Sequence, residues 1–168
     1  MNDFNTVRAS YERRLQAVRK ANELNKTIVF DALAAASITQ VFVEFDGYGD
    51  SGQIEGITAH MGEPPKALPA PAATGASPAV QAAAAVTLPK TRLTLHQAPW
   101  NSEELGTYET TLQDAIENLC YGYLEQEHDG WENNDGAFGE FRFNVAERTI
   151  ELEFNGRFTD TYTENHSF

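Results

Sequence analysis

The sequence predicts a single α+β domain over residues 1–168, with helices packed on one face of an antiparallel sheet of four or five strands. Three observations predict this class. Apolar residues recur at helical spacing near the N-terminus and again in residues 105–124. The period changes to two in residues 39–57 and 141–154, as expected of half-buried strands. The length suits one core and is too short for two domains.

The expected element order, α-α-β-β-linker-(β)-α-β-β, begins with two helices. Residues 4–20 place apolar side chains three or four positions apart, with Arg and Lys between them, which predicts an amphipathic helix with a basic outer face. Residues 23–37 predict a second helix. Direct nucleic-acid binding is not expected of the chain, except through the basic helix near residues 8–20.

Residues 39–57 predict a β-hairpin. Val41, Val43 and Phe45 alternate with other side chains, and Ile54 and Ile57 continue the pattern beyond a glycine-rich turn. The turn lies in an acidic segment, residues 45–55, with the sequence Phe-Asp-Gly-Tyr-Gly-Asp-Ser-Gly-Gln-Ile-Glu. Because Gly, Asn and Asp tolerate positive φ, this segment is expected to follow a tight path and to present its polar side chains outward.

Residues 62–90 are expected to be a flexible Pro/Ala-rich linker or an insertion within the domain. They contain six of the seven prolines and ten alanines. Proline fixes φ and removes a backbone donor, so this composition prevents a continuous helix or a central strand.

The second half of the chain predicts an edge strand at residues 91–97, followed by a helix. Leu93 and Leu95 alternate with polar neighbours in the strand. Apolar residues then follow helical spacing through residues 105–124. Thr111 and Asp114 resemble a capping box, and the helix is expected to end near His128.

The C-terminal third predicts a second hairpin. Residues 141–145 and 150–154 alternate apolar and polar side chains, and a turn is expected at residues 146–148. Phe158 and Tyr162 suggest a further short strand before a loose C-terminus.

Charge and cysteine content restrict the classes of protein. The formal net charge is −13, a balance that favours solubility and repels both nucleic acid and anionic membranes. The charge is uneven, with a net of +3 in residues 1–30 and −12 in residues 91–168. Cys120 is the only cysteine, which excludes an intrachain disulfide. With no signal peptide or membrane span in the sequence, the expected location is cytoplasmic.

Known catalytic and metal-binding patterns do not fit the chain. Counted from Asp46, the acidic segment lacks the ligands and the glycine of an EF-hand loop. Glu125 and His128 have di-iron spacing, but the other ligand-bearing helices of such a site are missing. Ser51 does not lie in a nucleophile elbow, and Cys120 belongs to an apolar stripe. The sequence therefore predicts no cofactor, no metal and no enzymatic activity, although a cation site of another type stays open.

The candidate site consists of two glycine-rich acidic loops. Residues 129–139 partly repeat the character of residues 45–55, and the two loops are expected to be neighbours on one edge of the domain. Tyr and Trp are favoured at interfaces, so Trp131 either joins an exposed recognition surface that can include Trp100, or caps the core. The predicted partner-binding residues are Asp46, Tyr48, Asp50, Ser51, Glu55, Trp131, Glu132, Asn134 and Asp135.

Three segments together resemble an uncharacterised family of small acidic bacterial proteins found on plasmids, phages and other mobile elements. They are FDGYGDSGQIE (residues 45–55), GWENNDGAFGEF (130–141) and RTIELEFNGRF (148–158). The resemblance covers about two-thirds of the chain and leaves out the Pro/Ala-rich linker. It implies a fold and a genomic context, and carries no known activity.

Two functions are compatible with these patterns. The first is a non-enzymatic module that binds a protein partner with a basic surface, in its most concrete form a counter-defence inhibitor that mimics nucleic acid. The alternative is a small enzyme or cation-dependent module in which Asp46, Asp50, Glu132 and Asp135 converge. Carboxylates spread over a face favour the first, and carboxylates pooled in a pocket favour the second.

Overall fold

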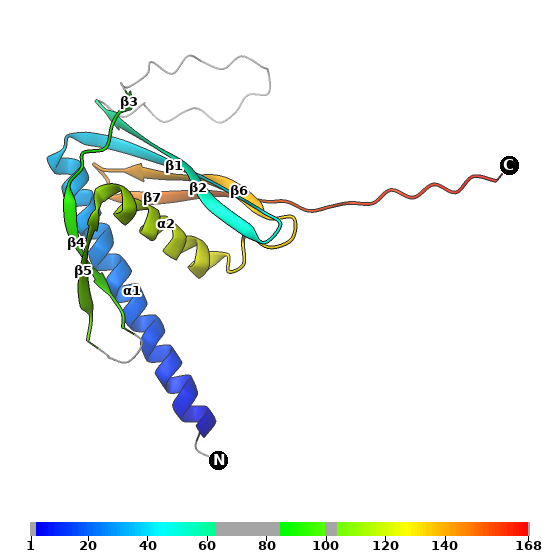
Figure 1. Ribbon diagram of the computed structural model, residues 1–168, viewed down its shortest axis with the longest axis horizontal. Helices are drawn as coiled ribbons and strands as arrows, with labels where there is room; N and C mark the ends of the chain where they lie inside the picture. The colour runs from blue at the N-terminus through cyan, green and yellow to red at the C-terminus, as the bar shows by residue number, and fades with distance from the viewer. Residues whose placement is uncertain (1–2, 63–84, 100–103, 168) are drawn as a thin grey trace.

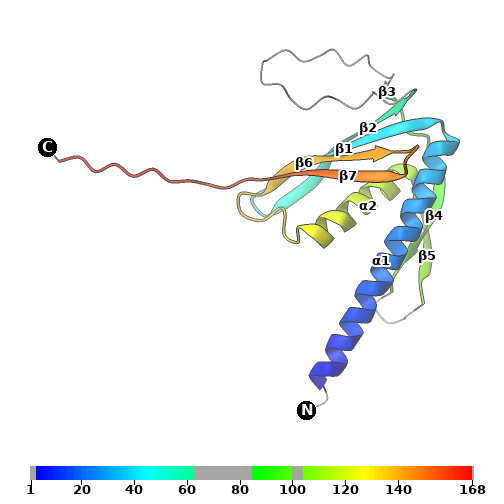
Figure 2. The same cartoon turned by 180° about the vertical axis from the view of Figure 1, so that it is seen from behind.

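The computed structural model describes residues 3–62, 85–99 and 104–167 and has an α+β fold, as the sequence predicts (Figure 1). A five-stranded antiparallel sheet has the strand order β3-β2-β1-β6-β7, and β4 and β5 form a separate two-stranded sheet. Both helices lie on the same side of the larger sheet (Figures 1 and 2). The elements are α1 (Asp3–Ala35), β1 (Ile38–Tyr48), β2 (Ser51–Met61), β3 (Ala85–Val86), β4 (Arg92–Gln97), β5 (Gly106–Thr111), α2 (Leu112–Glu127), β6 (Ala137–Asn144) and β7 (Thr149–Gly156).

The two helices predicted at the N-terminus are one continuous helix, α1, of 33 residues. Nothing between residues 20 and 23 interrupts it, because this stretch contains neither Gly nor Pro. The C-terminal half of α1 buries Ala21, Val29, Phe30 and Leu33 against the domain. Its N-terminal half projects beyond the domain (Figures 1 and 2). The helix ends at Ala35, and Ser37 just beyond it has a φ of 58°, which a right-handed helix does not allow.

The core lies between the helices and the inner face of the larger sheet. Alternate residues of β1 and β6 point into it, and α2 covers them from the other side. Each fully buried apolar side chain of this kind contributes about 1.5–3 kcal/mol. The largest fully buried side chains include Phe30, Leu33, Val41, Val43, Leu112, Ile116, Leu124, Phe141 and Phe143.

Residues 106–111 were expected to open the third predicted helix, at residues 105–124, and instead form β5. Leu105 and Tyr108 fit a helical period, but Thr107, Thr110 and Thr111 are β-branched and favour a strand. The predicted cap is confirmed, because Thr111 is the N-cap of α2 and its hydroxyl accepts a hydrogen bond from the Asp114 N–H at 3.1 Å. The strand predicted at residues 91–97 is β4, which pairs with β5 rather than with the larger sheet.

Asn25 joins α1 to the smaller sheet. It is a buried polar residue with 6% of its surface exposed. Its side-chain amide donates to the His96 carbonyl at 2.9 Å, and its side-chain oxygen accepts from the His96 N–H at 2.7 Å. The two bonds satisfy both backbone groups of one residue of β4, so Asn25 fixes the position of that strand on the helix.

The remaining predictions concern the linker and the C-terminus. Residues 63–84 of the predicted linker lie outside the described residues, whereas Ala85 and Val86 form β3 at the edge of β2. The further short strand predicted at Phe158 and Tyr162 is not formed, since residues 157–167 have no helix or strand.

Candidate functional site

The two acidic loops are neighbours, as the sequence predicts. Gly49 and Asp50 connect β1 to β2, and both have positive φ, as a two-residue hairpin turn of type I′ requires. The Gly49 N–H donates to the Asn134 carbonyl at 3.1 Å, and the Asp50 N–H donates to the Glu132 carbonyl at 3.3 Å. The contact lies at one end of the strands, not along a lateral edge of the sheet.

Trp131, from the second loop, packs against the first loop on the inner side of the sheet. Only 8% of its surface is exposed, and its ring packs edge-on against Phe45 with centroids 5.4 Å apart. The indole also lies against Gly47 and Gly52, where any Cβ would collide with it. Of the two interpretations of Trp131, the structure supports the core cap. The prediction that Trp131 is exposed in a recognition surface is wrong, because Gly47 and Gly52 leave room for its ring to be buried.

Arg157 is a residue of this end that the sequence did not identify. Its guanidinium donates to both carboxylate oxygens of Asp46, at 2.9 and 3.0 Å, and to the Gly47 carbonyl at 2.9 Å. It also lies 4.7 Å from the centre of the Phe138 ring. Only its position directly after an alternating strand could have drawn attention to it. Asp46 is therefore half-buried and ion-paired rather than freely presented.

Four of the predicted residues line one shallow depression on the outer face of the sheet. Its volume is about 290 Å³. Tyr48, at the rim, is 68% exposed, and Glu55 accepts a hydrogen bond from the Gln53 side chain at 3.0 Å. The lining residues are Asp46, Tyr48, Ser51, Gly52, Gln53 and Glu55. The structure thus brings the first loop's predicted residues together, except for Asp50, which is exposed at the turn.

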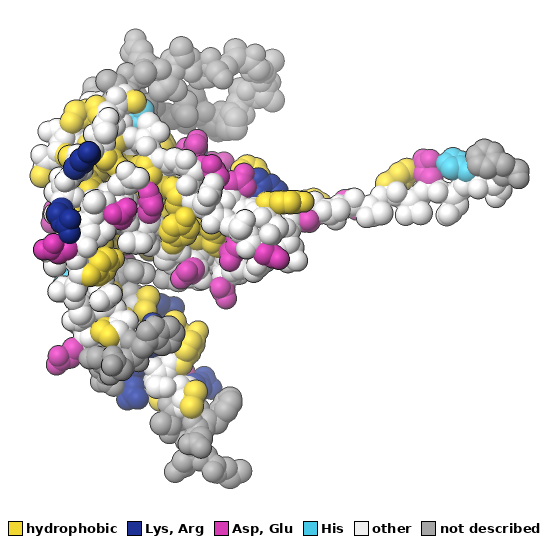
Figure 3. All heavy atoms as spheres, viewed as in Figure 1, with side chains coloured by type: hydrophobic (Ala, Val, Ile, Leu, Met, Phe, Trp, Pro, Cys, Tyr) yellow, Lys and Arg dark blue, Asp and Glu magenta, His cyan; other side chains and the backbone are white. Residues whose placement is uncertain are grey.

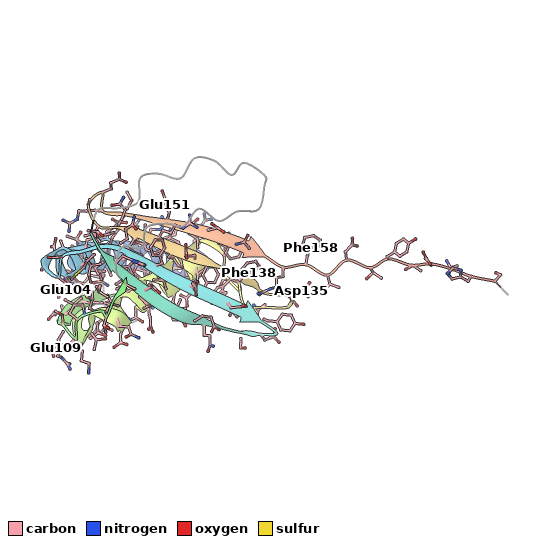
Figure 4. The ribbon with its side chains drawn as sticks, turned by 90° about the horizontal axis from the view of Figure 1, so that it is seen from above. Glu104, Glu109, Asp135, Phe138, Glu151 and Phe158 are labelled. Carbon is pink, nitrogen blue, oxygen red and sulfur yellow. The ribbon has the colours of Figure 1, made fainter. Side chains whose placement is uncertain are left out.

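The second loop contributes less exposed side-chain surface than expected. Glu132 is half-buried and Asn134 is exposed, and both use backbone carbonyls to hold the β1–β2 turn. Asp135 accepts a hydrogen bond from the Thr159 hydroxyl at 2.9 Å. Asp135, Phe138 and Phe158 lie where the C-terminal residues leave the sheet (Figure 4). Trp100, considered with this cluster, lies outside the described residues.

Carboxylates extend from the loops across the outer face of β1, β2, β6 and β7. Glu140 lies directly opposite Glu44 on one side and Glu153 on the other. Arg142 is hydrogen-bonded to Glu140 at 2.6 Å and to Glu153 at 2.9 Å, and the bond to Glu140 raises the pKa of Arg142. We call this surface the acidic face; its carboxylates are Glu44, Asp46, Glu55, Glu140, Glu151 and Glu153.

The acidic face has no described helix over it and a clear excess of negative charge. Six carboxylates face two guanidinium groups, those of Arg142 and Arg157, which leaves a net charge of −4. Asp and Glu side chains are spread over the body of the domain, and several Lys and Arg side chains lie on the projecting half of α1 (Figure 3).

The described residues include no cluster of side chains suited to bind a metal ion. Across residues 3–62, 85–99 and 104–167, no group of three or more His, Cys, Asp or Glu side chains could hold a metal ion. Cys120 is buried, and burial, followed by the charge of Glu117, raises the pKa of its thiol. A protonated, inaccessible thiol is a poor nucleophile. Within the same part of the chain, no helix is long and apolar enough to cross a membrane.

The three segments that carry the family resemblance meet at this end of the sheet. Asp46, Gly47 and Gly52 come from the first, Trp131 and Phe138 from the second, and Arg157 from the third. No curated protein and no solved structure matches the chain. A family model does match, over residues 21–81 and 74–168. The chain therefore belongs to DUF6878, a family of unknown function, in agreement with its resemblance to an uncharacterised family.

Proposed function

We propose that the protein is a non-enzymatic binding module that engages a basic surface of a protein partner through the acidic face and the adjoining β1–β2 turn. The observation that carries the proposal is the row of glutamates at positions 44, 140 and 153, which lie opposite one another on three adjacent strands. Like charges directly opposite each other destabilise a sheet. Arg142 bridges Glu140 and Glu153, but no described ion pair involves Glu44. Stability of the isolated domain therefore does not account for Glu44 in this row, whereas a cationic partner would.

The spacing of the row suits mimicry of a nucleic-acid backbone. Neighbouring strands lie about 4.8 Å apart, and residues two positions apart on a strand lie about 6.7 Å apart. DNA carries one charge per about 3.4 Å of each strand. The acidic face would thus be a sparser array of comparable scale, able to occupy a basic nucleic-acid groove. In its most specific form, the protein is a counter-defence inhibitor encoded by a mobile element.

The alternative, a cation-dependent or enzymatic site at the two loops, has less support. It requires Asp46, Asp50, Glu132 and Asp135 to converge, and no metal-ligand group of that kind occurs among the described residues. Asp46 is neutralised by Arg157, and Asp135 accepts the Thr159 hydroxyl. These contacts give two of the four carboxylates structural partners.

Two variants of equal charge test the proposal. One replaces Glu44, Glu140 and Glu153 with Gln on the acidic face. The control replaces Glu125, Glu127 and Glu147, which are exposed elsewhere, with Gln. The wild-type chain is immobilised, incubated with lysate of a bacterial host, and the bound protein is identified by mass spectrometry, purified and titrated directly.

We expect a nucleic-acid-binding protein whose affinity for the acidic-face variant falls about a hundredfold or more, while the control loses less than tenfold. Duplex DNA should compete for the same partner, and added salt should weaken the complex. Equal losses of affinity in the two variants would show that binding depends on overall charge and not on the acidic face. A partner that binds DNA and this protein simultaneously would exclude mimicry.

A further inference from the structure

The C-terminal tail, residues 158–167, continues straight from β7 and leaves the domain (Figures 1 and 2). Phe158 is 84% exposed and Tyr162 is 85% exposed. The last links to the domain are the Arg157 N–H, which donates to the Gly136 carbonyl at 2.9 Å, and the Thr159 hydroxyl bonded to Asp135. Beyond Thr159 the tail has an extended path and no strand partner among the described residues.

The tail has the sequence pattern of a strand. Phe158, Asp160, Tyr162, Glu164 and His166 alternate with three threonines and an asparagine. Thr, Phe and Tyr favour strands, and the tail contains neither Gly nor Pro. An isolated extended segment of this kind gains its stability only when its backbone groups pair with another strand.

β7 offers an edge for such pairing. It is the terminal strand of the described sheet, and its eight residues include no Pro or Lys that would protect the edge. On its inner face Ile150, Leu152 and Phe154 are only half-buried. The tail does not reach the edge of its own β7, because it runs onward in the same direction. The β7 edge of a second copy can be reached without any change in this path.

We propose that the tail is a β-strand that forms on a second copy of the chain. In this dimer, β7 and the tail of one copy pair antiparallel with the tail and β7 of the other. The two five-stranded sheets become one continuous sheet, and each acidic face is extended by that of the second copy. The two-fold axis passes beside Phe158.

The register follows from the side-chain pattern and the charge. With Phe158 opposite Phe158 of the second copy, the eight residues of β7 lie opposite residues 160–167. Phe154 then faces Tyr162, and cross-strand aromatic pairs stabilise antiparallel strands. Glu151 faces Asn165 and Glu153 faces Thr163, so no acid opposes another on the outer face.

A register shifted by one residue would place the tail's Asp160, Tyr162 and Glu164 on the outer face, where the two acids would add to the negative charge of Glu151 and Glu153. In the proposed register Tyr162 lies on the inner face opposite Phe154, and Glu164 lies on the same face opposite Leu152. In the proposed register each copy contributes residues 149–167, which is close to the 20–30 residues per side of a standard interface.

The first test is the mass of the full-length chain in solution. We expect a dimer of twice 18.6 kDa by light scattering or sedimentation. Each copy carries a charge of −13, so added salt should strengthen the dimer by screening repulsion. This is opposite in sign to the salt dependence expected for a basic partner, which separates failure of the dimer from failure of the proposed function.

Proline substitution tests the tail itself. A double variant, Thr161→Pro with Tyr162→Pro, tests the hydrogen bonds of the tail. Because adjacent residues of a strand direct their N–H groups to opposite sides, it removes one N–H that would bond to the partner strand, and it alters no residue packed in the domain. Dimer affinity should fall about a hundredfold or more, whereas the matched variant Thr161→Ser with Tyr162→Phe should change it less than tenfold. A wild-type chain that stays monomeric at all concentrations and salts, or a dimer that survives both prolines, would overturn the proposal.

Cross-linking tests the register. In the variant Phe158→Cys, the introduced thiols of the two copies face each other across the axis, within the Cα separation of 4.4–6.8 Å that a disulfide needs. Cys120 is buried and does not compete. Oxidation should give a covalent dimer with Phe158→Cys and none with Glu147→Cys, which lies in the distant β6–β7 turn. Equal cross-linking of the two variants, or none, would contradict the register.

Discussion

The two faces of the larger sheet are built from the same strands and have opposite properties. On β1, Val41, Val43 and Phe45 are at most 2% exposed, while Glu44 between them is exposed on the other face. β6 repeats the arrangement, with Phe141 inside and Glu140 outside. All charged residues of β1, β2, β6 and β7 belong to the acidic face. The period of two thus separates stabilising residues from those available to a partner.

The comparison is tested most strongly by two adjacent substitutions on β6. Phe141 is 1% exposed, and its ring centroid is 5.8 Å from that of Phe45. Phe141→Ala should lower the free energy of unfolding by about 3–5 kcal/mol, because it leaves a cavity in the core. Glu140→Ala removes a partly exposed ion pair with Arg142 and should cost less than about 1 kcal/mol. Urea unfolding measures both, and similar losses would show that the faces are not energetically distinct.

Alkaline pH should lower the stability of the domain through titrating groups on its inner side. Burial, followed by the charges of Glu23 and Cys120, raises the pKa of Tyr123 from 10.0 to about 12, and burial also raises the pKa of Cys120 above its ordinary 9.0. The folded state holds both protons more tightly than the unfolded state does. This contribution to stability is therefore fully present below about pH 9 and is lost as pH rises through the folded pKa values.

Tyr123→Phe removes one of these titrating groups. The loss of stability between pH 10 and pH 12 should become shallower in this variant. Tyr11→Phe is the control, because Tyr11 is 61% exposed on the projecting half of α1 and should leave the profile unchanged. Urea midpoints measured across this range give the comparison, and identical profiles for the three proteins would exclude Tyr123 as a source.

The smallest effect on stability is expected on the acidic face, where a substitution should stabilise the domain rather than destabilise it. Glu44→Gln removes one of two like charges directly opposite each other and should stabilise the domain by about 0.2–1 kcal/mol at low salt. Glu147→Gln makes the same charge change in the β6–β7 turn and serves as the control. The difference between the two should shrink as salt is added. Destabilisation by Glu44→Gln alone would mean that Glu44 has a structural role.

Local periodicity predicted much of the fold because it depends only on residues that are close in the sequence. The alternation in β1, β6 and β7, the Thr111 cap and the end of α2 at His128 all follow from short-range patterns. β5 was missed because the positions of Leu105 and Tyr108 also satisfy a helical period. The single helix α1 was missed because a weaker apolar pattern around residues 20–23 suggested a break.

The candidate site was predicted in location more than in detail. Adjacency of the loops followed from their similar composition and their positions beside strands. The roles of Trp131 and Arg157 depend on contacts with residues about 80 and 110 positions away in the chain, respectively. Such contacts leave no local pattern, so the sequence alone could not show that Asp46 is ion-paired or that Trp131 is buried.

The packing of Trp131 has a consequence for the evolution of the family. The indole occupies the space that side chains at Gly47 and Gly52 would need, so the three positions are constrained as one unit. A relative with a small residue in place of Trp131 would be free to carry larger residues at both glycine positions. A relative that keeps the tryptophan should keep both glycines. The three residues should therefore be inherited together, although two of them are far from the third in the chain.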